Sequence, residues 1–300
     1  MEKYMNYFRY TIKNKETGKN LKEWLQSFNL AKNKINYLID NKCIMINDEI
    51  VYKREFILKE NDEITIDVSN YEQIDYLPLR YNLDIIYEDD YILIVNKPSG
   101  VLIYPENKEL SNTMANYIAY YYTKTNQNKT IRHVHRLDTD TTGCLVYAKD
   151  IITHSYLSNL FENSNVKKEY NAIVCGIIEK SGKIDTPIGR NRHNNLMITS
   201  PNGLKALTLY KPLKHIDGNT LLNVEIKTGR THQIRVHMAS IKHPLLGDVM
   251  YGKKDEYNRV MLHCSHIGFI HPVYKYWVDF FAEIPQDMKY IIGDNNEFIK

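Results

Sequence analysis

The sequence predicts an α+β fold, in which a mixed or antiparallel sheet flanked by helices follows a small α/β module. From residue 83 onward, short apolar or alternating stretches dominate, as is typical of strands. Apolar residues with helical spacing occur in a few separate stretches, so we expect helices interspersed among the strands. The first 68 residues differ, because two short helical patterns there precede small strands.

Residues 1–68 are predicted to be a separate module. Residues 7–12 form an expected strand, and two helices are expected where apolar residues recur at helical spacing. These residues are Leu21, Trp24, Leu25 and Phe28 for one helix, and Ile35, Leu38 and Ile39 for the other. Residues 43–51 then read as a strand, a turn and a strand, and residues 63–68 alternate like a half-buried strand.

The helical half of this module is basic. Residues 13–42 hold seven Lys against three acids, and Lys32 and Lys34 are the candidates for phosphate contacts. A solvated, lysine-rich helix face without a nucleic-acid partner is the alternative interpretation.

The remaining chain is predicted to be one larger domain. Residues 69–82 show little periodicity and are expected to be a linker to a domain over 83–300. Its expected strands cover residues 85–87, 91–95, 144–148, 169–175, 206–210 and 221–226. Its expected helices cover residues 111–123, 151–163 and 231–241.

Composition excludes several classes of protein. Hydrophobic content of 43% and charged content of 25% are those of an ordinary globular protein, and the net charge of +3 permits an RNA partner without requiring one. No apolar stretch approaches the roughly 20 residues of a membrane span. The first residues lack a secretion signal, and the four scattered cysteines have no C-x-x-C pair, so we expect a cytoplasmic protein with reduced thiols.

Arginine is distributed unevenly along this lysine-rich chain. The sequence has 29 Lys and 10 Arg, and six of the Arg lie between residues 132 and 235. Arginine offers a rigid planar fork for carboxylates and phosphates, which lysine does not. The clustering therefore favours a site in this region, although chance clustering is the alternative.

The most informative segment runs from His135 to Gly143, His-Arg-Leu-Asp-Thr-Asp-Thr-Thr-Gly. It places Asp138 next to Arg136, in a polar turn at the start of the apolar run 144–148. An acid at the mouth of a buried strand is a common position for a reacting group. A lone Asp at such a place more often starts a turn or caps a helix.

Further segments argue against a purely structural role for Asp138, because they occur in the same order as the motifs of a known family. The segment 135–143 resembles the HRLD-x-x-[TS]-[ST]-G signature of the RluA/RluD-type RNA pseudouridine synthases. Residues 96–100, 168–172 and 229–238 resemble the family's NKP-x-G loop, K-x-Y-x-A strand and GRTHQIRVH helix. The resemblance extends from about residue 83 to about residue 285 and includes Tyr251-Gly252 and His271-Pro272. Thr142 and Cys264 stand where the family more often has Ser and Ala, which are mild departures.

The resemblance implies an enzyme that isomerises uridine to pseudouridine in RNA. It places the catalytic carboxylate at Asp138 and a pocket aromatic residue at Tyr170. It also implies that Arg235 is a buried arginine that keeps the Asp138 carboxylate ionised and correctly oriented. It also implies RNA contacts from the catalytic part, at Arg136, Arg230, His232 and Gln233. The reaction neither oxidises nor reduces its substrate and loses no group, so we expect neither cofactor nor metal.

The N-terminal module has a weaker resemblance of its own. It is similar to the alpha-L RNA-binding module of a ribosomal small-subunit protein, whose G-x-V-x-V-N-G pattern survives at residues 43–49 with Asn47 but without both glycines. Such a module ahead of this catalytic domain favours large-subunit ribosomal RNA as the partner over transfer RNA. No obligate protein partner is implied.

Other classes of function remain alternatives. Asp138 and Asp140 would share one face of a strand, as a glycosidase pair of carboxylates could. His232 with His237, and His263 with His266, could suggest a metal site, but the first spacing is five rather than the four that aligns ligands on a helix. A non-catalytic RNA-binding protein is a further alternative, against which Asp138, Tyr170 and Arg235 argue.

Overall fold

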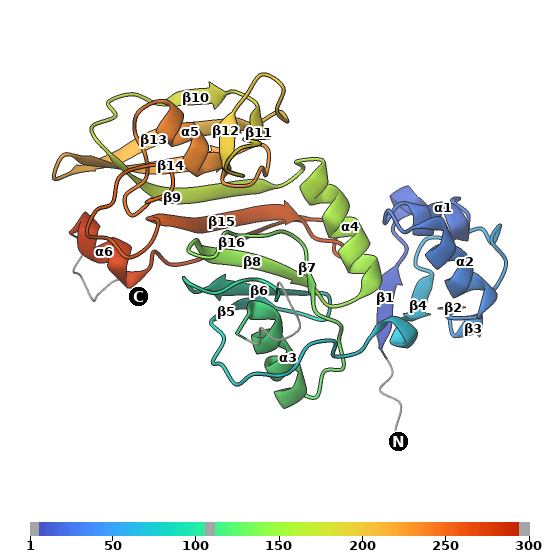
Figure 1. Cartoon of the computed structure of the whole chain (residues 1–300). Coiled ribbons are helices and arrows are strands. Elements are labelled where there is room, and N and C mark those ends of the chain that lie inside the picture. The colour runs from blue at the N-terminus through green and yellow to red at the C-terminus, as the bar shows by residue number, and fades with distance from the viewer. Residues whose placement is uncertain (1–5, 106–111, 294–300) are drawn as a thin grey trace.

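The computed structural model describes residues 6–105 and 112–293 of the chain (Figure 1). Residue 111, the first residue of the helix expected at 111–123, lies outside these ranges. The start of the expected module (1–5) and the end of the expected larger domain (294–300) lie outside them too. Within them, the strands form a small four-stranded sheet, a ten-stranded mixed sheet and a separate two-stranded ribbon. The predicted α+β class is confirmed.

The small sheet belongs to the N-terminal module. Its strands are antiparallel in the order β1-β4-β2-β3, with β1 at Tyr7–Thr11, β2 at Ile44–Ile46, β3 at Glu49–Ile50 and β4 at Glu63–Asp67. Helices α1 (Leu21–Gln26) and α2 (Lys32–Asp40) bury their apolar faces, as the spacing predicted. Asn20 caps α1 by accepting a hydrogen bond from the Glu23 backbone N–H. Short 3-10 turns occupy Asn14–Glu16 and Ser69–Tyr71.

The large sheet has the strand order β10-β13-β14-β9-β15-β8-β6-β5, with β16 and β7 paired to β15 and β8. Its first strands are β5 (Ile85–Glu88), β6 (Ile92–Lys97), β7 (Arg132–His133), β8 (Thr142–Ala148) and β9 (Lys167–Cys175). Later strands are β10 (Gly182–Asp185), β13 (Leu207–Ile216), β14 (Asn219–Ile226), β15 (Leu262–Ile270) and β16 (Trp277–Phe281). The ribbon consists of β11 (Ile188–Arg190) and β12 (Met197–Thr199).

The centre of the large sheet explains the glycine of the signature. Strands β8 and β15 run parallel there, and Gly143 lies opposite Cys264 with a φ of +111°. A Cβ atom at Gly143 would lie 2.2 Å from the carbonyl oxygen of Cys264, so a larger residue would push the two strands apart.

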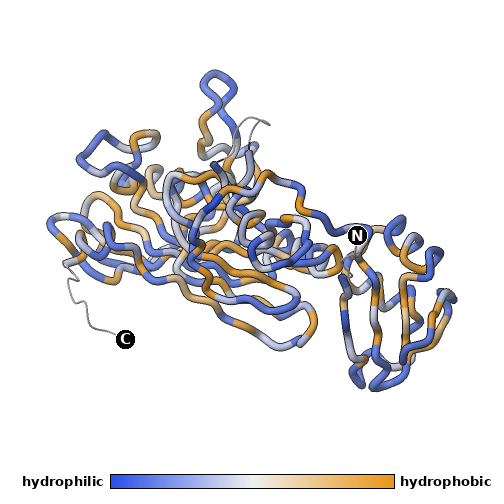
Figure 2. Tube along the Cα trace, turned by 90° about the horizontal axis from the view of Figure 1, so that it is seen from below, coloured by the Kyte–Doolittle hydropathy of each residue, from blue (hydrophilic) through white to orange (hydrophobic). Residues whose placement is uncertain are grey.

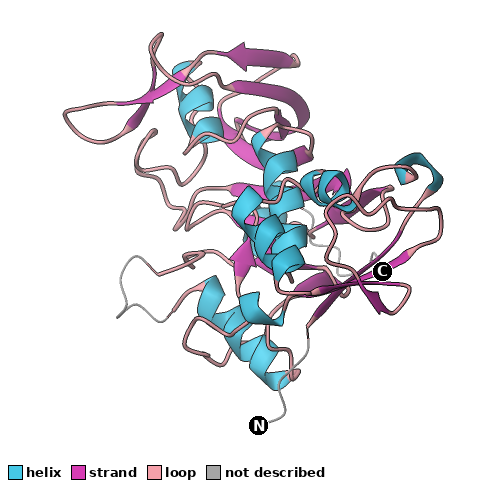
Figure 3. Ribbon diagram, turned by 90° about the vertical axis from the view of Figure 1, so that its right-hand side faces the viewer, coloured by secondary structure: helices cyan, strands magenta, loops and turns pink. Residues whose placement is uncertain are grey.

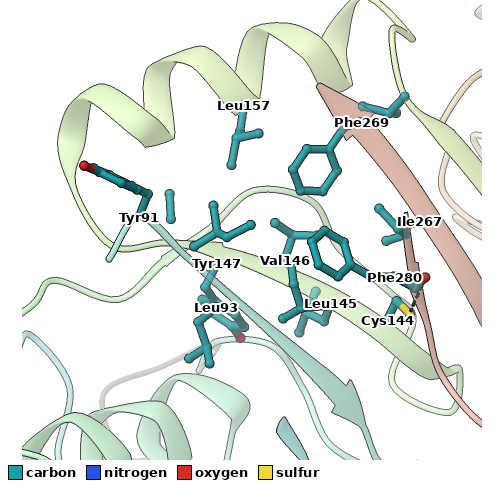
Figure 4. Packing of buried hydrophobic residues seen from close by; sticks show 14 of the residues in the cluster. Tyr91, Leu93, Cys144, Leu145, Val146, Tyr147, Leu157, Ile267, Phe269 and Phe280 are labelled. Carbon is teal, nitrogen blue, oxygen red and sulfur yellow. Dashed lines mark hydrogen bonds between the residues drawn. The ribbon is translucent and has the colours of Figure 1, made fainter. Parts of the chain in front are cut away.

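Helices lie around this sheet (Figures 1 and 3). They are α3 (Met114–Lys124), α4 (Ile151–Glu162), α5 (Gln233–Ser240) and α6 (Gln286–Ile292). Asp150 caps α4 by accepting hydrogen bonds from the N–H groups of Ile152 and Thr153. Leu157 of α4 points towards the apolar residues of β8 and β15, among them Val146 and Phe269 (Figure 4). The hydropathy trace shows the same arrangement, with hydrophobic stretches along the strands and hydrophilic loops (Figure 2).

All the strands and helices expected from the sequence are present, with boundaries shifted by a few residues. Sequence reasoning missed β7, the strands β10 to β12, the last helix α6 and the sheet strands β15 and β16. Strand β15 contains two histidines, a serine and a glycine, so its pattern is not that of a buried strand, although β15 lies between β9 and β8. Long-range pairing, which local pattern does not report, makes it central.

The N-terminal module packs firmly against the rest of the chain. Lys275, which has a φ of +61°, places its ammonium 4.3 Å from the ring centre of Phe28 and 3.9 Å from that of Tyr156. Tyr91 donates a hydrogen bond to the Arg9 carbonyl at 2.9 Å, and its ring contacts Phe8 edge-on. Such contacts between a cation and aromatic faces are worth on the order of 1 kcal/mol each, and the apolar core is continuous across this junction.

The segment 69–82 also lies against the larger part of the chain. Glu72 forms an ion pair with Arg132 at 2.7 Å, in which both side chains are buried. Burial raises the pKa of Glu72 to about 7, against the opposing effect of Arg132. Tyr81 stacks on Tyr117 of α3, with ring centres 4.0 Å apart. The segment therefore has a defined path along the part of the chain that contains the large sheet.

In the described ranges, no helix combines the length and the apolar character that a membrane crossing would require.

Candidate active site

Asp138 lies in a turn whose backbone is stabilised by hydrogen bonds from a buried lysine. Lys97, fully buried at the end of β6, donates hydrogen bonds to the carbonyl oxygens of Thr139 at 2.7 Å and Thr141 at 3.1 Å. A third bond goes to the carbonyl of Pro98, so all three ammonium protons are used. Burial lowers the pKa of Lys97 to about 7, and the nearby Asp140 and Asp138 oppose that shift. The Asn-Lys-Pro segment thus fixes the turn that presents Asp138.

Arg235 lies beside Asp138, but its strongest partner is another acid. Its Nη1 is 3.6 Å from Oδ2 of Asp138, whereas Nε and Nη2 each donate to the carboxylate of Asp248 at 2.8 Å. Asp248 is fully buried, and Arg235 is 8% exposed. The expectation that Arg235 is buried is confirmed, and its ion pair with Asp138 is present, although Asp248 is the closer partner. Asp248 fixes the guanidinium plane, and one edge of this plane then faces Asp138.

His232 approaches the same carboxylate oxygen of Asp138. Its Nε2 is 3.8 Å from Oδ2 of Asp138, and its Nδ1 is 2.9 Å from the hydroxyl of Tyr251. The Tyr251 hydroxyl accepts a hydrogen bond from the Met197 N–H of β12, which leaves its own proton for His232 Nδ1. Burial lowers the pKa of His232, which favours the neutral ring. A Tyr251 hydroxyl that donates to Nδ1 would leave the ring proton on Nε2, towards Asp138.

The backbone supports this placement. His232 has a φ of +55° and a ψ of +23° at the start of α5, a left-handed conformation that is uncommon outside glycine. Gln233, the next residue, is locked by hydrogen bonds to Thr228, to Leu207 and to the N–H of Arg230. This tight turn brings His232 and Arg235 to the same carboxylate.

Two cavities meet at Asp138. The first, called the Tyr170 cavity, has a volume of about 410 Å³ and is lined by Tyr170, Lys168, Phe161 and Arg230 among others. The second, called the Met250 cavity, has a volume of about 420 Å³ and is lined by Met250, Val249, Tyr104 and Tyr257 among others. The residues that line both cavities are Arg136, Leu137, Asp138, His232 and Arg235.

Tyr170 forms part of the wall of its cavity from β9. It is 5% exposed, and burial raises the pKa of its hydroxyl well above the usual value, so the phenol stays protonated. Lys168, two residues earlier on the same strand, is also buried, and its ammonium lies 5.7 Å from the ring centre of Phe161. The cavity therefore combines a flat aromatic wall with a cation, which suits a planar polar ring.

The other predicted RNA contacts divide into three groups. Arg136 is exposed at the mouth of both cavities, and Arg230 lines the Tyr170 cavity while donating to the Lys205 carbonyl. Gln233 lines the Tyr170 cavity but is only 3% exposed with its amide bonded internally, so it supports the turn and its RNA contact stays a prediction. Lys32 is exposed and Lys34 half-buried on α2, and neither lines these cavities.

Sequence reasoning gave no role to Lys97, Lys168, Asp248 and Tyr251, although all four lie in the motif segments. Their order in the family-like motifs was the available signal. What it could not show is that Asp248 and Tyr251 fold back onto Arg235 and His232.

The histidine pairs do not form a metal site. His237 bonds to Thr208 and Thr186, and His263 bonds to Thr142 and the Ala282 carbonyl. Across residues 6–105 and 112–293, no group of three or more His, Cys, Asp or Glu is arranged to hold a metal ion. Asp140 is exposed in the turn after Asp138, so the two acids do not share the face of a strand.

The mixed sheet and the carboxylate between two cavities are those of an RNA-modifying isomerase of the pseudouridine synthase class. Residues 91–240 match the family model described as RNA pseudouridylate synthase, and the chain belongs to this family. It is thus an enzyme that converts uridine to pseudouridine in RNA, as the motifs predicted.

Relatives agree over most of the chain. The "Uncharacterized RNA pseudouridine synthase YhcT" of Bacillus subtilis (strain 168) is 38% identical over 84% of this chain and 84% of its own length. The "Ribosomal large subunit pseudouridine synthase D" of Zymomonas mobilis is 34% identical over 87% of this chain and 88% of its own. The protein of the same name from Vibrio parahaemolyticus is 33% identical over 93% and 91%.

Solved structures show the same fold. The structure titled "Human RNA Pseudouridylate Synthase Domain Containing 1" has a TM-score of 0.58 at 29% identity, covering 67% of this chain and 83% of its own. The structure titled "Human RNA Pseudouridylate Synthase Domain Containing 4" has a TM-score of 0.59 at 21% identity, covering 70% and 92%, and supports the fold alone.

Proposed function

We propose that this synthase modifies large-subunit ribosomal RNA in the cytoplasm, without an obligate protein partner. Relatives named for the large ribosomal subunit that match most of the chain support this substrate class. The basic face of the N-terminal module supports contact with a structured RNA. Transfer RNA is the competing substrate.

The observation that carries the catalytic assignment is the position of Asp138 between Arg235, His232 and the Tyr170 cavity. The target uridine leaves its helix, and its uracil lies against Tyr170, which supplies a flat face. Asp138 attacks the anomeric carbon or removes a proton from the neighbouring carbon, and both routes need an ionised carboxylate. The N1–C1′ bond breaks, a C5–C1′ bond forms, and a proton passes from C5 to N1.

The remaining residues assist this step. Arg235, fixed by Asp248, holds the carboxylate in place, and His232 presents its Nε2 proton to the same oxygen. Arg136 and Arg230 at the cavity mouth bind phosphates of the extruded nucleotide. The buried ring of Tyr170 lines the cavity, and the bound nucleotide displaces water from the reacting atoms.

The substrate class can be tested by mapping pseudouridines in cells that lack this protein. We expect one or more pseudouridines to disappear from large-subunit ribosomal RNA and to return with a plasmid copy. Losses confined to transfer RNA would refute the ribosomal assignment and leave the enzyme class intact.

The Tyr251–His232 contact predicts a specific pH effect. Tyr251→Phe removes the donor to His232 Nδ1, so the neutral ring is less favoured and the pKa of His232 rises. The acid limb of the single-turnover pH profile should therefore move to higher pH, because His232 becomes charged earlier. His232→Gln, which cannot titrate, should lose that ionisation from the profile. Identical acid limbs in all three proteins would contradict the assignment.

The division of the chain is also a proposal: an RNA-binding module over 1–68, a connecting segment over 69–82 and a catalytic domain over 83–300. Because Phe8 and Phe28 pack on Tyr91 and Tyr156, deleting the module would expose apolar surface. A charge change tests the module more cleanly than a deletion.

Lys32→Glu should weaken RNA binding and lower the salt slope of log Kd by about 1, since one phosphate contact is lost. The rate at saturating RNA should stay unchanged, because Lys32 lines neither cavity. Lys59→Glu, an exposed change outside the helices, is the matched control. Equal affinity and equal salt slopes for both variants would show that α2 does not bind RNA.

A further inference from the structure

Two apolar side chains are exposed next to the catalytic acid. Val249 is 66% exposed and Met250 is 44% exposed, and both line the Met250 cavity together with Asp138. A polar side chain would be hydrated there without penalty, whereas an exposed apolar pair gains free energy when another surface covers it.

The turn that carries this pair is rigid. Asp248, whose carboxylate is bound to Arg235, also accepts hydrogen bonds from the N–H groups of Met250 at 3.1 Å and Tyr251 at 3.2 Å. The Asp248 carbonyl accepts from Gly252 N–H at 2.8 Å. The same carboxylate that orients Arg235 therefore fixes the backbone that presents Val249 and Met250.

The start of the turn is equally constrained. Gly247 has a φ of +74°, and a Cβ atom there would lie 1.7 Å from the Arg259 carbonyl oxygen. Only glycine allows this close approach, which seats the turn on the buried segment around Arg259. Exposure of the apolar pair is thus a property of a fixed element.

The surroundings indicate what covers the pair. The Met250 cavity shares Asp138, Arg136 and His232 with the Tyr170 cavity, so a chain bound in one continues into the other. Tyr104 of the Met250 cavity stacks on His133 of the Tyr170 cavity, with ring centres 5.1 Å apart. Aromatic and apolar walls suit a nucleobase, and the exposed Arg136 between the cavities suits the phosphate that joins two nucleotides.

We propose that Val249 and Met250 form an apolar wedge against which the base next to the target uridine packs while the uridine occupies the Tyr170 cavity. This inference rests on the proposed function of the Asp138 site. Extruding a base sacrifices stacking with its neighbours, and apolar side chains inserted beside the gap restore part of that contact. Asp248 anchors the turn that carries the wedge and also orients Arg235 next to Asp138. The wedge and the catalytic acid therefore keep a fixed position relative to each other.

The test combines a protein change with an RNA change. The RNA is a large-subunit ribosomal fragment in which the wild-type protein converts one mapped uridine, used intact and with an abasic site at either neighbouring nucleotide. The protein variant is Val249→Ser with Met250→Gln, which replaces both exposed apolar side chains with polar ones. The matched control is Ile177→Gln with Leu213→Ser, an exposed apolar pair that lines neither cavity. Thermal unfolding of all proteins is measured in parallel.

On intact RNA, we expect the wedge variant to slow single-turnover conversion by about tenfold, since a wedge offsets only part of the loss of one stacking step. On one of the two abasic RNAs, the variant and the wild type should react at similar rates, because the base that contacts the wedge is missing. The control should match the wild type on every RNA.

Equal rates for variant and wild type on intact RNA would overturn the proposal. The same tenfold loss on both abasic RNAs would also overturn it, because the effect would then not depend on the neighbouring base. Failure of the proposed function appears differently, as a wild-type protein that converts no uridine in any ribosomal fragment.

Discussion

Asp138→Asn should lower the rate of pseudouridine formation by about four orders of magnitude, the scale seen when a central catalytic carboxylate is removed. The amide has nearly the same shape, so Lys97 can still hold the turn through backbone carbonyls. The variant loses the negative charge that both possible routes require. Fold and RNA affinity should remain near those of the wild type, since the amide fills the same space and the neighbours Arg235 and His232 keep Asp248 and Tyr251 as partners.

The measurement is single-turnover conversion of a mapped ribosomal fragment, with RNA affinity determined separately. Asp140→Asn is the matched control, because Asp140 is an exposed acid in the same turn. Its rate should stay near the wild-type value, whereas the paired-carboxylate alternative requires both acids. Appreciable turnover by a folded Asp138→Asn protein would remove Asp138 from the catalytic role.

Arg235→Lys should have the second largest effect, a loss of roughly a hundredfold in rate, the scale of a misplaced reacting group. Lysine keeps the positive charge but cannot bond to both Asp248 oxygens and also face Asp138. The buried Asp248 would lose one of its two hydrogen bonds from residue 235. The free energy of unfolding should therefore also fall, by about 1–3 kcal/mol. The wedge turn would loosen as well, because the same carboxylate anchors it.

A control must separate lost stability from lost positioning. Arg132→Lys serves, because Arg132 also forms a buried ion pair, with Glu72, and lines neither cavity. We expect it to lower stability by a similar amount while leaving the rate constant for conversion unchanged. If both variants lose rate in proportion to stability, Arg235 is a structural arginine only.

The site shows where local sequence patterns carry information and where they do not. Asp138, Tyr170 and Arg235 were predicted to be catalytic because each lies in a motif whose order along the chain matches a family. The dominant partner of Arg235 was not identified, because Asp248 lies in a loop 13 residues further on, and no periodicity specifies how that loop folds back. Gln233 was expected to contact RNA because the resemblance implies it, and the structure shows its amide buried in the turn.

The sequence by itself determined the enzyme family, the α+β class and the strands whose residues are apolar enough to be recognised, such as β6, β8 and β9. These features depend on residues near one another in the chain. Only the tertiary structure decided that β15 inserts between β9 and β8, that Lys275 joins the module to α4, and that two cavities meet at Asp138. Each of these depends on contacts between distant segments, whose free energy comes from packing and from shared hydrogen bonds rather than from local propensity.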